Sequence, residues 1–110
     1  MQFDIEMRSK HKDLFLEIRD VLLSFDGVRE KINTRSVCYH TSQGGLCHLK
    51  TTNDGVDVGF FRGIRMEDAY NMLWGAGKSK KFISLQAMNE EALVYYVVQA
   101  LEINAGRQPR

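Results

Sequence analysis

The feature that most limits the possible folds is a run of short β-rich segments separated by turn signals between Arg35 and Phe61. RSVCYHT and GLCHLKT flank a four-residue turn at 42–45, and the turn at 53–55 leads into VDVGFF. Clusters of Gly, Asn, Asp and Ser between such segments are typical of hairpins. Strands joined in sequence by tight turns pair antiparallel. We therefore expect a hairpin and a third strand in one antiparallel sheet.

A segment whose apolar residues have helical spacing precedes these strands. Apolar residues recur every three or four positions and predict a helix over about 10–25, with Ser9 as its N-cap and Gly27 at its end. Asp26 is then suited to cap a second, shorter helix over about 27–33.

Three further elements are expected after the third strand. The apolar pattern predicts about two helical turns over 66–74, ended by two glycines, which readily adopt the positive φ of helix C-termini. The segment SKKFISL, at 79–85, is predicted as a fourth strand. Asn89 suits the N-cap of a last helix that extends to about Asn104.

The two long terminal helices have broad apolar stripes that need a surface to cover. The economical arrangement is an α+β two-layer sandwich, in which an antiparallel sheet of about four to five strands is covered on one face by the N- and C-terminal helices. A chain of 110 residues fits one domain, expected over 1–106 with a disordered tail over 107–110.

Charge and cysteine content restrict the environment. The formal net charge of +1 offers no global attraction to nucleic acid or acidic membranes. No segment approaches the roughly 20 apolar residues of a membrane span, and the charged N-terminus does not resemble a signal peptide. Two cysteines, Cys38 and Cys47, are too few for a secreted disulfide scaffold, so we expect reduced thiols in a cytoplasmic protein.

Three sequence blocks precede the apolar last helix: FFRG at 60–63, LWGAGK at 73–78 and KFISL at 81–85. Together with that helix they resemble the YdhG-like family of bacterial domains of unknown function (domain of unknown function 1801), and the resemblance covers about residues 10–104. It implies a two-layer α+β fold similar in outline to frataxin and no catalytic residue that can be transferred. One bacterial branch is described as a frataxin-like iron chaperone with acidic surfaces, whereas here the acids are scattered and the segment 62–81 is basic.

A candidate anion site lies in this basic segment. Gly77-Lys78-Ser79 matches the end of a phosphate-binding P-loop, but Met72 stands where the motif needs glycine, and the order of elements is inverted. An NTPase site is excluded, and a simpler site of basic side chains and freed backbone amides remains. The alternative is a glycine helix end beside a solvated basic strand edge. The candidate ligand-binding residues are Phe61, Arg62, Trp74, Gly75, Gly77, Lys78 and Lys80.

A second candidate site lies in the hairpin. With a four-residue loop, Cys38, His40 and Cys47 share one face and His48 takes the other. Three such ligands could hold zinc, although a structural zinc site takes four. The alternative is that the cysteines are small apolar core residues, and a hairpin bulge would break the alignment. We expect no resident metal or cofactor and retain the trio as the alternative.

A two-layer sandwich leaves one sheet face without helices. Whichever hairpin face that is, it is partly apolar, which suggests a homodimer or a ligand surface, unless the predicted helix over 66–74 covers it. The RNP motif of RNA-binding sheets is absent, so nucleic acid is not the expected partner.

The sequence lacks a complete catalytic constellation, because a neighbouring cysteine and histidine have no third orienting group. We therefore expect a non-enzymatic module that binds a small anionic ligand or a protein partner. The alternative function is a frataxin-like iron or metal chaperone.

Overall fold

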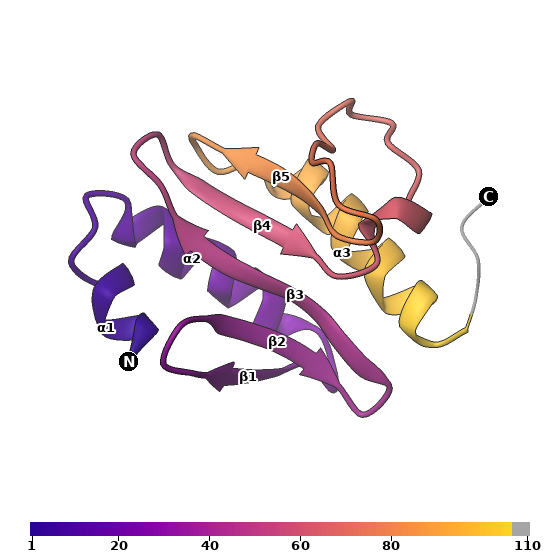
Figure 1. Ribbon diagram of the computed structural model, residues 1–110, viewed down its shortest axis with the longest axis horizontal. Helices are drawn as coiled ribbons and strands as arrows, with labels where there is room; N and C mark the ends of the chain where they lie inside the picture. Colours follow the sequence, from indigo (N-terminus) through magenta and orange to yellow (C-terminus); the bar gives the residue numbers. More distant parts are fainter. Residues whose placement is uncertain (107–110) are drawn as a thin grey trace.

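Five antiparallel strands form one sheet in which each strand lies beside the next strand of the chain (Figure 1). The computed structural model describes residues 1–106. In chain order the elements are α1 (Gln2–Glu6), α2 (Lys12–Ser24), β1 (Arg29–Ile32), β2 (Val37–Thr41), β3 (Gly44–Thr51), β4 (Val56–Phe60), the 3-10 turn η1 (Gly63–Arg65), β5 (Lys81–Leu85) and α3 (Glu90–Asn104). The predicted α+β class is confirmed.

The two long helices cover the same face of the sheet, as predicted. Both α2 and α3 pack on the central strand β3 and contact each other, and both lie behind the sheet in Figure 1. The opposite face is left without either long helix. The last helix begins as expected, because the Asn89 side chain accepts a hydrogen bond from the Ala92 amide at 3.1 Å.

Alternation along the strands decides which side chains enter the core. Directly paired residues share a face, and the buried pairs Val37–Leu49, Leu49–Val58 and Val58–Ile83 form a continuous row beneath the helices. Burying one large apolar side chain contributes about 1.5–3 kcal/mol, so this interface between layers dominates stability. The helices contribute the buried side chains Phe15, Ile18, Leu22, Leu93, Tyr96 and Val97.

The short helix predicted over 27–33 is wrong, since this segment contains the edge strand β1. Its side chains alternate with the period of a strand, and Glu30 faces the helix layer. There Glu30 accepts two hydrogen bonds from Arg19 of α2 and one from the Tyr39 hydroxyl. These long-range partners override the weak local preference of four residues.

The predicted four-residue loop of the β2–β3 hairpin is also wrong. The pairing of Thr41 with Gly44 leaves a two-residue turn, and the register shifts between Tyr39 and His40. The shift leaves Leu46 as the extra residue of a β-bulge. Beyond the bulge Tyr39 pairs with Cys47, so the two buried side chains share the helix-covered face.

The segment 66–74 does not form the predicted helix, and its last residue, Trp74, reaches the exposed sheet face, where it stacks on Phe82. The Asp68 carboxylate accepts hydrogen bonds from the amides of Met72 and Leu73 and from the Tyr96 hydroxyl of α3. Asn71 has a φ of 55°, in the left-handed region that interrupts a helix. The chain then extends, and Trp74 pairs with Phe82 at the edge of β5.

The N-terminal turn α1 has no counterpart among the predicted elements. Its Glu6 is buried and accepts hydrogen bonds from the amide and the hydroxyl of Thr51, both at 2.9 Å. α2 begins at Lys12, slightly later than predicted, because Ser9 accepts from the His11 amide in the preceding turn. Within residues 1–106, no helix has the length and apolar character needed to cross a bilayer.

Candidate ligand-binding face

One row of directly paired residues crosses the whole sheet on the side opposite the helices, and we call this side the uncovered face. Successive pairings join β1 to β2, β3, β4, β5 and finally to the extended residue at 74. Because paired residues share a face, their side chains form one surface. The row consists of Lys31, Cys38, His48, Gly59, Phe82 and Trp74.

Glycine in the middle of this row lets two rings meet. The centroids of His48 and Phe82 lie 5.8 Å apart, edge to face, above Gly59. A Cβ on Gly59 would lie 2.5 Å from His48 Cε1. Gly45 makes similar room for Phe61, whose ring centroid lies 5.9 Å from that of His48.

Trp74 continues this cluster at the edge of the sheet. Its ring stacks on Phe82 with centroids 4.8 Å apart and planes 22° from parallel. Trp74 Nε1 donates to Ser84 Oγ at 2.9 Å, and that hydroxyl donates to Asp57 at 2.7 Å. The indole is thus fixed at one edge, yet Trp74 remains 48 % exposed.

Lys80 places its ammonium beside three of these rings. Its Nζ lies 5.1 Å from the Phe61 centroid, 5.8 Å from the Phe82 centroid and 3.3 Å from His48 Nδ1. Burial, followed by the charges of Lys80 and Lys50, lowers the pKa of His48 to about 4. The imidazole is therefore neutral at pH 7. An ammonium can only donate, so Nδ1 is the acceptor.

A half-open hollow of about 290 Å³ lies beside these rings, and we call it the basic hollow. Three cations, Arg35, Lys50 and Lys80, line it, and none of the described residues around it is acidic. An adjoining hollow of about 390 Å³ includes Lys31 and His40. The basic hollow is lined by Gln2, Arg35, Ser36, Cys38, His48, Leu49, Lys50, Phe61 and Lys80.

The structure brings together part of the predicted ligand site. Phe61, Trp74 and Lys80 lie around the same ring cluster. Arg62 instead donates to Asn104 of α3 at 3.3 Å. The Gly75 carbonyl accepts from the ammonium of Lys81, which faces the helix side. The remaining two residues, Gly77 and Lys78, are exposed in the link before β5.

Sequence reasoning missed Arg35, His48, Lys50 and Phe82 as members of one surface. The alternation of His48 and Lys50 along β3 is a signal that could have placed both on one face. Arg35 and Phe82 come from a distant turn and a distant strand, so only the tertiary arrangement identifies them.

The alternative metal trio is not assembled. Cys38 lies on the uncovered face opposite His48, whereas Cys47 is fully buried on the helix side, where burial raises the pKa of its thiol. The bulge at Leu46 causes this separation by changing the pairing register. In the part of the chain that the structure describes, no three His, Cys, Asp or Glu side chains gather as metal ligands.

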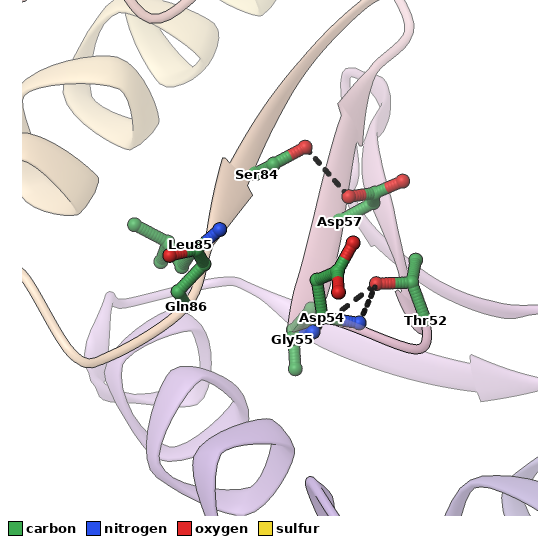
Figure 2. A pocket seen from close by; sticks show the side chains of 8 residues that line it. Thr52, Asp54, Gly55, Asp57, Ser84, Leu85 and Gln86 are labelled. Carbon is green, nitrogen blue, oxygen red and sulfur yellow. Dashed lines mark hydrogen bonds between the residues drawn. The ribbon is translucent and has the colours of Figure 1, made fainter.

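A further hollow of about 280 Å³ lies where the β3–β4 turn meets the end of β5 (Figure 2). Thr52 Oγ1 accepts from the amides of Asp54 and Gly55, and Ser84 donates to Asp57, as Figure 2 shows. A Cβ on Gly55 would lie 2.0 Å from the Leu85 carbonyl oxygen. The hydroxyl groups that line this hollow are therefore engaged in hydrogen bonds that stabilise the turn.

The fold and the surface define a two-layer α+β protein with an exposed, basic and aromatic sheet face. Comparison with protein-family models, with curated proteins and with solved structures finds no match to this chain.

Proposed function

We propose that the protein is a non-enzymatic binding module that holds an anionic ligand in the basic hollow of the uncovered face. The observation that carries the proposal is the convergence of Arg35, Lys50 and Lys80 on one half-open hollow that has no acid among the described residues lining it. An anion in such a concavity is attracted by all three charges at once and is partly shielded from water.

The polar groups of the hollow favour binding over catalysis. His48 is neutral and engaged by Lys80, so it is not a free base poised near pH 7. The Cys38 thiol donates to Ser36 Oγ at 3.3 Å, and no hydrogen bond joins it to His48 among the described residues. An activated nucleophile needs a base in contact with it.

The sequence blocks at 60–63, 73–78 and 81–85 support a further proposal, membership of the YdhG-like family, whose implied two-layer α+β fold is compatible with this arrangement. The iron-chaperone alternative has no specific observation in its favour. Asp54 and Asp57, two acids that line one hollow, belong to the hydrogen-bonded turn of Figure 2.

The test is calorimetric titration of the protein with pyrophosphate and with citrate at low salt. The triple variant Arg35→Ala/Lys50→Ala/Lys80→Ala should weaken binding at least about tenfold, because each lost charge contact contributes on the order of 1 kcal/mol. The matched control is Arg62→Ala/Lys78→Ala, which removes basic residues that do not line the hollow. Equal binding by both variants, or no binding by the wild type, would contradict the proposal.

A further inference from the structure

We propose that the occupant of the uncovered face is a single-stranded nucleic acid, with bases stacked on the exposed rings and phosphates on the surrounding cations. This inference rests on the proposed anion site and names its ligand. Stacking aromatics combined with a positively charged track are the two elements of single-strand recognition. Both are present on this face.

Trp74 is built as a stacking platform. One face of the indole is occupied by Phe82 at 4.8 Å, and its Nε1 is held by Ser84, yet about half of the residue is exposed. A ring fixed in this way loses little conformational freedom when a base stacks on it. Phe61 offers a second, partly exposed ring between the two hollows that flank it.

The cations are distributed along the row and are not confined to one point. Arg29 and Lys31 alternate with Glu30 on β1, so both side chains belong to the uncovered face. Lys80 lies on the ring cluster, and Arg35 and Lys50 lie in the basic hollow. The row from Lys31 to Trp74 has five steps of about 4.8 Å, or roughly 24 Å, which suits an extended strand of several nucleotides.

The net charge of +1 does not reveal this basic surface, because the sheet face and the helix layer carry charges of opposite sign. Among the residues that the structure describes, the uncovered face holds five cations, of which Arg35 lies in the β1–β2 turn. The acid that the strands place on this face, Asp57, accepts a hydrogen bond from Ser84. The two long helices hold many of the acids: Asp13, Glu17, Asp20, Glu90, Glu91 and Glu102. A polyanion therefore encounters a local positive field that composition averages away.

Exposed rings favour a single strand over a duplex, because paired bases are already stacked and hidden. They also favour nucleic acid over an acidic peptide, which would use the cations and leave the Trp74 platform unused. Both competitors are outcomes of the test below.

The experiment uses Trp74, which is the only tryptophan of the chain, as its own reporter. Intrinsic fluorescence and anisotropy are followed while the protein is titrated with fluorescein-labelled or unlabelled oligo(U) and oligo(dT) 12-mers. An abasic 12-mer, a 12-base-pair duplex and a poly-glutamate peptide are titrated in parallel. We expect the single strands to quench Trp74 and to bind at least about tenfold more tightly than the abasic strand, since stacking is lost in the latter.

Two variants separate stacking from charge. Trp74→Ala should weaken 12-mer binding about tenfold or more and should weaken pyrophosphate binding much less, and Trp74→Phe should restore most of the loss because a ring is retained. The triple variant Arg35→Ala/Lys50→Ala/Lys80→Ala should weaken the binding of both the 12-mer and pyrophosphate. It should also make the affinity for the 12-mer less dependent on salt concentration.

The outcomes distinguish this inference from the proposed function. Pyrophosphate binding combined with equal affinity for the abasic strand, the duplex or the peptide overturns the nucleic-acid inference and leaves the anion site standing. Absence of pyrophosphate binding together with absence of 12-mer binding overturns both. Trp74 quenching that survives in the triple variant at unchanged affinity overturns the anion site and, with it, the placement of phosphates on these three cations.

Discussion

The rings of His48 and Phe82 meet above Gly59, the residue that separates them in the sheet, with their centroids 5.8 Å apart. Gly59 is buried although it lies on the face without long helices. The two rings therefore form a local cover over the backbone of β4. This relationship makes the stability of the sheet and the shape of the candidate site depend on the same residue.

Gly59→Ala should destabilise the protein by about 1–3 kcal/mol, because the added methyl group overpacks this contact. Its Cβ would lie 2.5 Å from His48 Cε1 and 2.9 Å from Phe82 Cε2. Urea unfolding measures the change in the free energy of unfolding.

The control for this substitution is the pair His48→Ala and His48→Ala/Gly59→Ala. In the absence of the imidazole, the same methyl group should cost less, although the Phe82 contact remains. An equal cost of Gly59→Ala in both backgrounds would show that the clash with His48 is not its origin.

His48 should titrate near pH 4 in the folded protein. Burial and the neighbouring lysines lower its pKa to about 4 from an ordinary value of 6.5. Between these values the unfolded chain binds more protons, so the free energy of unfolding should rise with pH across this window. After allowance for the partial exposure of His48, the free energy of unfolding should be up to about 2 kcal/mol higher at neutral pH than below pH 4 as a result of this shift.

Nuclear magnetic resonance of the His48 ring measures the titration directly, and urea unfolding at several pH values measures the linkage. His48→Gln should flatten the dependence of stability on pH between 4 and 6.5. Lys80→Ala should move the pKa of His48 upward, because it removes the nearest cation. A midpoint near 6.5 in the wild type would contradict both the burial and the contact with Lys80.

The sequence was sufficient to predict the layered architecture. The helical spacing over 10–25, the cap at Asn89 and the turn signals between strands depend on neighbours in the chain, and these local rules are confirmed. The errors over 27–33 and 66–74 arose where distant partners decide the conformation. Arg19 fixes Glu30 in an edge strand, and Tyr96 helps to fix Asp68 in a loop.

The candidate surface was less predictable because one bulge determines it. The predicted register puts Cys47 on the same face as Cys38 and His48 on the other. With Leu46 as an extra residue, His48 instead shares the uncovered face with Cys38, and Cys47 enters the core. A sequence pattern with period two does not specify where such a bulge falls. Phe61, Trp74 and Lys80 were identified from their own segment, but Arg35 joins them only through the sheet.

The two cysteines should differ sharply in reactivity. Cys47 is fully buried and its pKa is raised by burial, whereas Cys38 is partly exposed at the edge of the basic hollow. A disulfide reagent such as Ellman's reagent should modify one thiol in the folded protein and two in denaturant. Cys38→Ser should abolish the native reaction, and pyrophosphate should slow it in the wild type. Rapid modification of both thiols without denaturant would contradict the assignment of Cys47 to the core.

Asp68 should control the order of the loop that presents Trp74. Its carboxylate accepts from the amides of Met72 and Leu73 and from the Tyr96 hydroxyl, so Asp68→Ala leaves three donors without this partner. We expect a loss of about 1–3 kcal/mol, faster hydrogen exchange of the two amides and a red-shifted Trp74 emission. Tyr96→Phe is the matched control, because it removes the hydroxyl donor and leaves the hydrogen bonds from the amides of Met72 and Leu73 to Asp68 intact. If the two variants accelerate exchange equally at Met72 and Leu73, the hydrogen bonds from these two amides to Asp68 are not what orders the loop.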